Sequence, residues 1–374
     1  FKMMRFWRDK GVGGFRLDVI NLISKPSDFP EDNTDGRRFY TDGPNVHEYL
    51  QQMHREVFEG HDLINVGEMS STSLEHCIRY SKPESKELSM TFNFHHLKVD
   101  YPNLQKWIRA DFDFLELKRI LSDWQTGMQA GGGWNALFWC NHDQPRVVSR
   151  FGNDGEFRVI SAKMLGTALH FLQGTPFVYQ GEELGMTNPG FDHIDQYRDV
   201  ETLNIFRFKR EAGASDADNM AAIMQKSRDN GRTPMHWNTE PNAGFSAAEP
   251  WIGVPANATQ INVATQLEDP DSVLHHYRQL IALRRSEALI SDGVYRQLLP
   301  EHPQIWAYVR EGQGERLLVL NNFYGTPCDV ELPDDVISEA MTQRLVISNY
   351  PNCPPRNRQI SLRPYESFVL HLTD

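Results

Sequence analysis

The sequence lacks the features that would suit a nucleic-acid or membrane surface. Lys and Arg number 38 against 50 Asp and Glu, which gives a formal net charge of −12 at pH 7, and the basic residues form no run. Binding to nucleic acid normally needs clustered Lys and Arg, so we expect a small polar ligand and no nucleic-acid partner. No apolar stretch is long enough to span a bilayer and no signal peptide is visible, so we expect a cytoplasmic protein with no membrane partner.

Cysteine is also scarce. The chain has four cysteines, Cys77, Cys140, Cys328 and Cys353, and they lie far apart. This spacing excludes a disulfide framework or a zinc ribbon and indicates ordinary buried thiols in a reducing compartment. Internal repeats and low-complexity tracts are absent too. The chain starts at Phe1 within an amphipathic helical pattern, so we expect further residues to precede it in the parent protein.

What the chain does contain is an alternation of apolar strands with helical segments. Five strand candidates occur at residues 14–20, 62–69, 89–94, 135–143 and 174–184. This rhythm is typical of a parallel sheet with crossover helices. Polar residues follow the apolar part of four of these strands, which favours a (β/α)8 TIM barrel over a doubly wound sheet. Since only five strands are visible, three more should lie upstream of Phe1.

Two domains are predicted. Residues 1–290 would form the partial (β/α)8 catalytic barrel, with a long irregular loop insertion around 186–270 that is rich in Pro, Gly, Asn and aromatic residues. Such an insertion usually serves as a binding loop or a lid. Residues 291–374 contain short strand patterns separated by turn residues, which predicts a small antiparallel β-sandwich domain.

Acidic residues at the strand ends suggest glycoside hydrolysis, in which a carboxylate and a carboxylic acid flank the scissile bond. Asp18 would be the nucleophile. Glu68 would be the general acid, with a pKa raised by burial or by the charge of Asp18, and Gly67 would leave space beside it for a ligand. Asp143 would be a third carboxylate that hydrogen-bonds the sugar hydroxyls, with His142 as a hydroxyl donor.

Arg16 lies two residues before Asp18, so the two side chains of this strand point the same way. Arg16 would hydrogen-bond Asp18 and keep it ionised. Simpler interpretations remain open for each residue alone: a structural ion pair for Arg16 and Asp18, a helix cap for Glu68 and a structural histidine for His142. We expect no metal site, because no close His, Asp or Cys ligand spacing accompanies the cluster.

Three motifs together carry a family resemblance. "GFRLDVIN", "NVGEMS" and "NHDQPR" resemble signatures of the α-amylase superfamily, glycoside hydrolase family thirteen, after the strands that would be four, five and seven. "GTPFVYQGEELGM" resembles the eighth strand, and "SRDNGRTPM" resembles a loop of the oligo-1,6-glucosidase branch. The resemblance implies strands four to eight of the barrel and a retaining α-glucosidase, with Asp18 as nucleophile, Glu68 as acid/base and Asp143 as transition-state stabiliser.

The resemblance also implies a binding set. Arg16, His142, Arg228 and Arg232 would bind the non-reducing glucose. The branch usually has "RTPMQWD" where this chain has "RTPMHWN", with His236 and Asn238. The resemblance implies that these two positions line the entrance. The difference therefore affects the expected preference for the leaving group more than the chemistry.

"GEMSSTS", "YTDGPNVHEYL" and "FNFHHLKVDYPN" are most similar to members of the branch that hydrolyse a phosphorylated disaccharide. Lys98 and Lys106 follow the sixth strand at the active end of the barrel and would then bind the phosphate. For either residue alone, a solvated lysine on a loop or helix remains an open alternative. The alternatives are an oligo-1,6-glucosidase, a sucrose or isomaltulose glucosidase of the same branch, or a catalytically inactive amylase-like scaffold.

No cofactor is expected within this chain. The loop that binds calcium in many family members is absent, so any calcium would belong to the part that precedes Phe1. Because three strands of the barrel and part of the glucose pocket would be missing, we expect this chain alone to be inactive.

Overall fold

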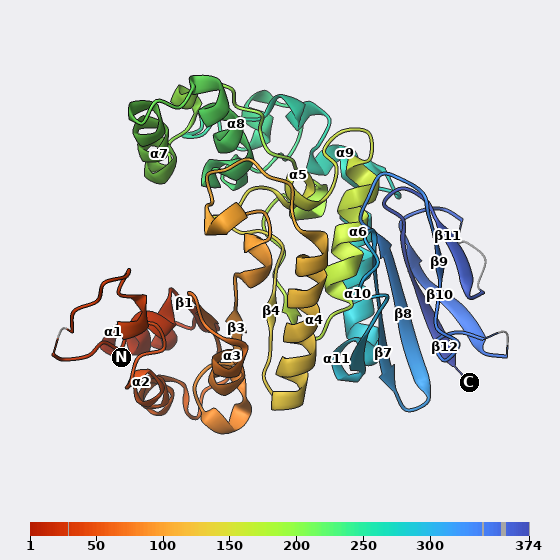
Figure 1. Ribbon diagram of the computed structural model, residues 1–374, viewed down its shortest axis with the longest axis horizontal. Coiled ribbons are helices and arrows are strands. Elements are labelled where there is room, and N and C mark those ends of the chain that lie inside the picture. The colour runs from red at the N-terminus through yellow and green to blue at the C-terminus, as the bar shows by residue number, and fades with distance from the viewer. Residues whose placement is uncertain (29, 339, 353–356, 374) are drawn as a thin grey trace. The chain divides into compact units, whose positions relative to one another are not determined.

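The computed structural model describes residues 1–28, 30–338, 340–352 and 357–373. The chain divides into two compact units (Figure 1). Unit 1 comprises Phe1–Leu97, Arg119–Leu137 and Gln173–Phe177. Unit 2 comprises Lys98–Lys118, Phe138–Leu172 and Val178–Asp374. This division by contacts differs from the predicted boundary at residue 290, which stays a prediction.

Unit 1 contains the five predicted strands, and all of their pairings are parallel. They are β1 (Gly14–Leu17), β2 (Ile64–Glu68), β3 (Met90–Phe92), β4 (Ala136–Leu137) and β5 (Thr175–Pro176). β1, β2 and β3 are neighbours in one sheet, β4 pairs with β5, and a bridge between Thr91 and Asn135 connects the two sets. The strands are therefore adjacent in chain order, as the alternation of strands and helices predicted.

Helices fill the connections between these strands. They are α1 (Lys2–Asp9), α2 (Val46–Met53), a π-helical turn (His54–Phe58), α3 (Leu74–Ser81) and α4 (Phe114–Gly131), the last of which contributes residues to both units. In α2 the buried residues Val46, Leu50 and Met53 recur at helical spacing, so one face of the helix enters the core of unit 1. Gly60 ends this segment with a φ of 78°, in the left-handed region that favours glycine.

After β4, the chain forms α5 (Val147–Phe151) and α6 (Arg158–His170) of unit 2. The next part of unit 2 differs from the sequence prediction. The insertion at 186–270 was expected to be irregular, but it contains α7 (Val200–Glu211), α8 (Asp216–Lys226) and α9 (Val263–Glu268). Asp199 and Ser215 cap the first two helices by accepting hydrogen bonds from Thr202 N and Asp218 N. In α7 only Thr202 is buried, so its sequence shows little apolar periodicity and hides the helix.

The rest of unit 2 is α10 (Val273–Ser286), α11 (Leu289–Asp292) and the C-terminal strands. A five-stranded antiparallel sheet has the order β10-β12-β8-β7-β6. Its strands are β6 (Val294–Leu298), β7 (Ile305–Gly312), β8 (Glu315–Asn322), β10 (Thr342–Ser348) and β12 (Ser367–Thr373). β9 (Cys328–Glu331) and β11 (Gln359–Leu362) form a second, two-stranded sheet. The predicted antiparallel β region is confirmed.

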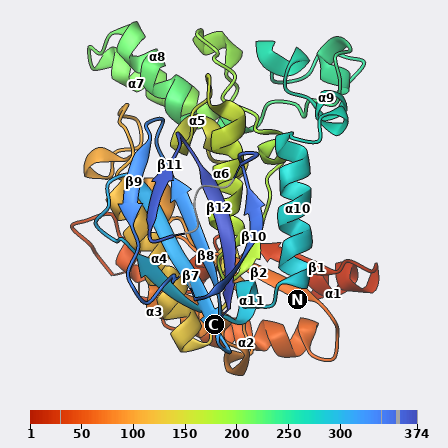
Figure 2. The same cartoon turned by 90° about the vertical axis from the view of Figure 1, so that its right-hand side faces the viewer.

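Both faces of the larger sheet are buried. Ile305, Ala307 and Val309 of β7 belong to the same apolar cluster as Val330 of β9 and Ile360 of β11. On the other face the Tyr308 hydroxyl donates to the Ala168 carbonyl at 2.8 Å, and α6 packs against β8 and β12 (Figure 2). This double coverage explains why β7 has an almost continuous apolar sequence.

The cysteines agree with the sequence interpretation where the structure describes them. Cys77 and Cys140 are buried free thiols, and Cys328 is a partly buried one. Cys353 lies outside the described residues.

Candidate active site

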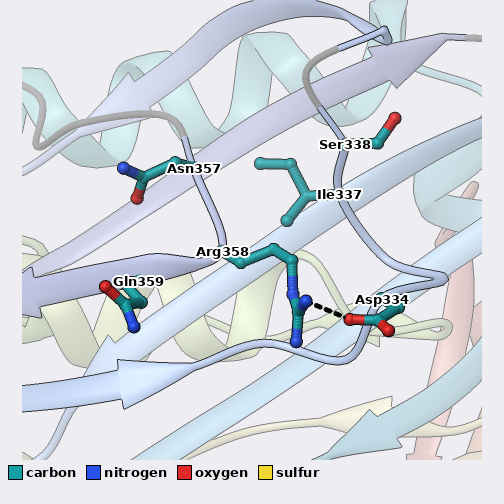
Figure 3. A pocket seen from close by; sticks show the side chains of 6 residues that line it. All are labelled: Asp334, Ile337, Ser338, Asn357, Arg358 and Gln359. Carbon is teal, nitrogen blue, oxygen red and sulfur yellow. Dashed lines mark ion pairs between the residues drawn. The ribbon is translucent and has the colours of Figure 1, made fainter.

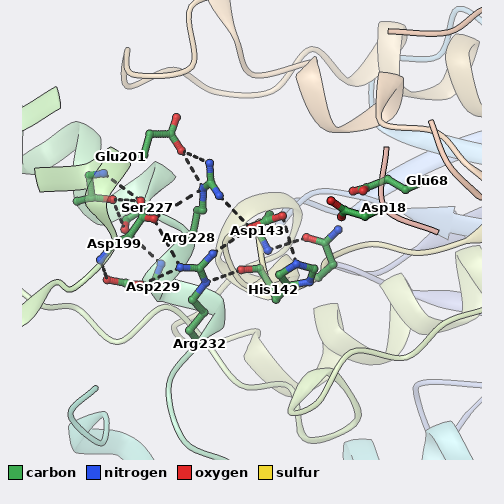
Figure 4. A network of polar contacts seen from close by, with 12 residues as sticks. Asp18, Glu68, His142, Asp143, Asp199, Glu201, Ser227, Arg228, Asp229 and Arg232 are labelled. Carbon is green, nitrogen blue, oxygen red and sulfur yellow. Dashed lines mark hydrogen bonds and ion pairs between the residues drawn. The ribbon is translucent and has the colours of Figure 1, made fainter. Parts of the chain in front are cut away.

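In unit 1 the parallel strands bring two acidic residues to the same edge. Leu17 of β1 is paired with Gly67 of β2, so Asp18 and Glu68 follow neighbouring positions. Arg16 forms an ion pair with the Asp18 carboxylate, and its second amino group lies 2.7 Å from Glu68 Oε2. One guanidinium therefore joins two carboxyl groups from adjacent strands, and Figure 4 shows the Asp18 and Glu68 side chains next to each other.

The two carboxyl groups have different surroundings. The Asp18 side chain is 75% exposed, whereas that of Glu68 is 9% exposed. Burial raises the pKa of the Glu68 carboxyl, and the hydrogen bond and charge of Asp18 act in the same direction. The Val19 amide, which donates to Glu68 Oε2 at 3.1 Å, and the charge of Arg16 oppose this rise. A carboxyl that keeps its proton beside an exposed carboxylate suits a proton donor next to a nucleophile.

Gly67 has a packing role instead of the predicted one. A Cβ at this position would lie 2.5 Å from Leu88 Cδ1 and 2.5 Å from Met69 Cε. The space beside Gly67 is thus filled by side chains of the core, and the prediction that it accommodates a ligand was wrong. A side chain at position 67 would require the ends of the Leu88 and Met69 side chains to shift.

Asn21, which the sequence analysis did not single out, ties the loops after β1 and β2 together. Its side-chain amide donates to the Ser70 carbonyl at 2.9 Å, and its Oδ1 accepts from Ser70 N at 2.9 Å. Its amide also donates to Asp42 Oδ1 at 3.1 Å, and Asn21 is fully buried. The loops that carry Asp18 and Glu68 are thereby held together, and only the "IN" ending of the first motif pointed to this residue.

In unit 2 a second cluster surrounds Asp143. Arg232 and Arg228 approach Asp143 Oδ1 at 2.9 Å and 3.2 Å, and His142 Nε2 lies 3.3 Å from Oδ2. Arg232 also donates to the His142 carbonyl at 2.7 Å. The four residues predicted from two separate motifs, His142, Asp143, Arg228 and Arg232, therefore form one group (Figure 4).

Further acids, which the sequence analysis missed, hold the two arginines. Arg232 lies 3.5 Å from Asp199 and 3.6 Å from Asp229. Glu201, in the first turn of α7, forms an ion pair with Arg228, with 2.8 Å between Glu201 Oε2 and Arg228 Nη2. The sequence offered one signal for these acids, the acidic residues 199 and 201 at the start of a helix. Acidic residues are common at helix starts in general, so this pattern did not indicate a functional site.

The two predicted phosphate ligands differ in their surroundings. Lys106 Nζ lies 2.8 Å from Glu201 Oε2, so Lys106 and Arg228 share one carboxylate. Lys98 is exposed, at the end of the 3-10 turn His95–Lys98. Lys106 is therefore connected to the Asp143 cluster through Glu201 and Arg228.

His236 does not line an entrance. It is 1% exposed, and its Nδ1 lies 2.8 Å from the Ile261 carbonyl oxygen. Its pKa is lowered by burial, which favours the neutral ring. The implication that this position lines the entrance was wrong, because the ring is buried in the fold of unit 2. Asn238 caps the adjacent turn by accepting from Glu240 N at 2.9 Å.

Beyond these clusters, the described residues contain a further cavity but no metal-binding group of side chains and no membrane-spanning helix. Within the described ranges, no group of three or more His, Cys, Asp or Glu side chains could hold a metal ion. None of the helices in the described part of the chain is long and apolar enough to cross a membrane. A cavity of about 440 Å³ in the C-terminal strands contains none of the candidate residues; it is lined by Asp334, Ile337, Ser338, Asn357, Arg358 and Gln359 (Figure 3).

Comparison with known proteins identifies relatives that cover the whole chain. Trehalose-6-phosphate hydrolase of Bacillus subtilis (strain 168) is 55% identical over 374 residues, which are 100% of this chain and 66% of that protein. Trehalose-6-phosphate hydrolase of Escherichia coli (strain K12) is 54% identical over 368 residues, which are 98% of this chain and 66% of that protein. The crystal structure of Bacillus licheniformis trehalose-6-phosphate hydrolase matches with a TM-score of 0.97 and 57% identity, over 100% of this chain and 67% of that one.

The chain thus spans just under two thirds of the length of the curated relatives it matches. Residues 305–369 match the alpha-amylase SusG C-terminal domain. Residues 1–293, which hold both clusters, match the alpha amylase catalytic domain. The chain belongs to the alpha-amylase family.

Proposed function

We propose that the natural protein carrying this chain is a retaining α-glucosidase that hydrolyses trehalose 6-phosphate to glucose and glucose 6-phosphate. The carboxyl pair of Asp18 and Glu68, joined by Arg16 and unequal in burial, is the observation that carries this proposal. The printed names of the two curated relatives support the choice of substrate. We also propose that β1 to β5 are strands four to eight of a (β/α)8 barrel, whose C-terminal strand ends carry the active site.

In the first step the Asp18 carboxylate attacks the anomeric carbon of the non-reducing glucose. The bond between that carbon and the glycosidic oxygen breaks, and Glu68 gives its proton to the departing oxygen. Glucose 6-phosphate leaves, and the remaining glucosyl group is covalently bound to Asp18. The raised pKa of Glu68 keeps the required proton available before the bond breaks.

In the second step Glu68, now ionised, removes a proton from water. The water oxygen bonds to the anomeric carbon, and the bond to Asp18 breaks, which releases glucose and restores both carboxyl groups. Asp143, held by Arg228 and Arg232, would hydrogen-bond the sugar hydroxyls as the ring flattens. Arg16 and His142 would complete the glucose site. Carboxyl groups and water suffice for this chemistry, so we propose no cofactor.

Lys106 and Lys98 would bind the phosphate. Lys106 is the stronger candidate because its ion pair with Glu201 connects it to Arg228, which contacts Asp143. A phosphate needs charge-assisted donors, and the net charge of −12 requires them to be local.

The test is hydrolysis of trehalose 6-phosphate, trehalose and isomaltose by the full-length natural protein. We expect the phosphorylated substrate to have the highest kcat/KM, and Asp18→Asn to abolish turnover of all three. Asp62→Asn is a matched control, since Asp62 is an exposed acid that precedes β2 at the end opposite Glu68.

The other outcomes identify the alternatives. A preference for isomaltose would assign the protein to the oligo-1,6-glucosidases. No turnover of any of the three sugars would favour the inactive scaffold. Full activity of Asp18→Asn would remove the proposed nucleophile.

A further inference from the structure

Glu201 is held by two cations through a single oxygen. Its Oε2 lies 2.8 Å from Lys106 Nζ and 2.8 Å from Arg228. The three side chains are 20%, 33% and 35% exposed for Lys106, Glu201 and Arg228. Water and small solutes can therefore reach this ion-pair cluster from one side.

The cluster leaves a defined place for an anion. Arg228 also contacts Asp143 at 3.2 Å, so a single guanidinium links the Glu201 carboxylate to Asp143. Without Glu201, Lys106 and Arg228 present two positive charges, which match a phosphate dianion. With Glu201 in place, one of those charges is neutralised.

The charges around the cluster determine whether an anion is attracted to it. Three cations, Lys106, Arg228 and Arg232, are paired with the four acids Asp143, Asp199, Glu201 and Asp229. An incoming dianion would meet a field with no excess of positive charge. Asp199 and Asp229 are buried, and Asp143 is the proposed transition-state stabiliser, so the partly exposed Glu201 at the start of α7 is the acid that can be displaced.

Building on the proposed function, we propose that Glu201 is a specificity-determining residue whose carboxylate occupies the phosphate position of the ligand-free protein. The substrate phosphate displaces it from Lys106 and Arg228, and the carboxylate turns into water. A doubly charged phosphate competes well against one carboxylate, whereas a neutral sugar hydroxyl does not. Glu201 thereby keeps both cations paired in the free protein until a ligand with a stronger negative charge releases them.

Glu201→Gln in the full-length natural protein tests this inference, with inorganic phosphate as the probe. The amide keeps the shape of the side chain and removes its charge. We expect phosphate binding, measured by calorimetry, to tighten about tenfold, which corresponds to about 1.4 kcal/mol. The ratio of kcat/KM for trehalose 6-phosphate to kcat/KM for an aryl α-glucoside should rise in the same direction; using the ratio cancels any general effect on Arg228.

Glu211→Gln is the matched control. Glu211 is an exposed residue at the other end of α7, so this variant removes the same charge from the same helix. We expect it to leave phosphate affinity and the selectivity ratio at wild-type values. Equal tightening in both variants would mean that only the overall charge matters, and would overturn the inference.

The outcomes separate this inference from the proposed function. If the wild type hydrolyses trehalose 6-phosphate and Lys106→Met weakens that reaction, but Glu201→Gln binds phosphate no more tightly, only the role of Glu201 is wrong. A loss of phosphate affinity in Glu201→Gln would show that Glu201 positions Lys106 and Arg228 and does not compete with phosphate, which would overturn the inference. If the wild type neither binds phosphate nor turns over the phosphorylated sugar, both proposals fail.

Discussion

Replacing Arg16 by Gln should disable the carboxyl pair while leaving the strand intact. The change removes the ion pair with Asp18 and the contact of 2.7 Å with Glu68. A hydrogen bond to a charged group contributes about 1.5–3 kcal/mol. Since Arg16 is 37% exposed and Asp18 is 75% exposed, solvent screening favours the lower end of that range. Two such contacts give about 3 kcal/mol, or about a hundredfold in kcat/KM.

The pH dependence distinguishes a role in catalysis from a role in folding. Burial raises the pKa of Glu68, and the charge of Arg16 partly offsets that rise. Without Arg16 the pKa of Glu68 should rise further, so the acid keeps its proton to higher pH. The alkaline limb of the kcat/KM profile, which reports this group in the free enzyme, should therefore move to higher pH.

The assay is hydrolysis of an aryl α-glucoside by the full-length natural protein at about pH 5 to 9. This range covers the titration of a carboxyl group whose pKa is raised. Arg5→Gln is the matched control, because Arg5 forms a similarly exposed ion pair with Glu56 at 2.7 Å on the same unit. We expect the control to behave as wild type. An Arg16→Gln protein with an unchanged alkaline limb, or one shifted to lower pH, would refute the assigned role of Arg16.

Three more predictions follow from the described contacts. Glu68→Gln should lose turnover of trehalose 6-phosphate but keep turnover of aryl glucosides whose leaving group needs no proton. Equal losses on both substrates would contradict the role of Glu68 as the acid. A crystal structure should place the carboxyl groups of Glu68 and Asp18 about 5–5.5 Å apart. Lys106→Met should raise the KM for trehalose 6-phosphate about tenfold or more, well beyond its effect on an aryl glucoside, and parallel losses in steady-state kinetics would move the phosphate elsewhere. His276, buried against Thr167, has its pKa lowered to about 3 by burial, so below pH 6.5 only the unfolded state gains its proton and stability falls as the pH decreases. At pH 4.5 the resulting loss in the free energy of unfolding is about 2.7 kcal/mol. In urea unfolding, His276→Gln should abolish this pH-dependent loss, whereas the control His275→Gln, at a half-exposed position, should keep it. An unchanged pH dependence in His276→Gln would contradict the assignment of the loss to His276.

Much of the fold could be predicted from local pattern. Each of the five parallel strands begins near its predicted position, because short apolar segments bounded by Gly and polar residues carry their own signal. The pairing of Arg16 with Asp18 was also predictable, since residues two apart in a strand share a face. The resemblance of three motifs to the alpha-amylase family assigned these residues before any contact was known.

The insertion shows where local pattern fails. α7 contains more charged and polar residues than apolar ones and buries only Thr202, so it shows little apolar periodicity, and α7 and α8 each begin with a side-chain cap. His236 was misplaced for a related reason: a histidine between Met and Trp gives no sign of whether it faces solvent or the core. Gly67 was assigned to the ligand because the sequence does not show that Leu88 and Met69 fill the space beside it.

The sequence by itself predicted the parallel strands, the acidic residues at their ends and the family, because these depend on neighbouring residues and on motif spacing. Only the tertiary structure decided that Glu201 lies between Lys106 and Arg228, residues separated from it by 95 and 27 positions. Likewise, only packing made Glu68 a buried acid and left Asp18 exposed. The physical reason is that charge pairing and desolvation depend on distances across the folded chain, and an isolated segment carries no record of which distant side chain will meet it.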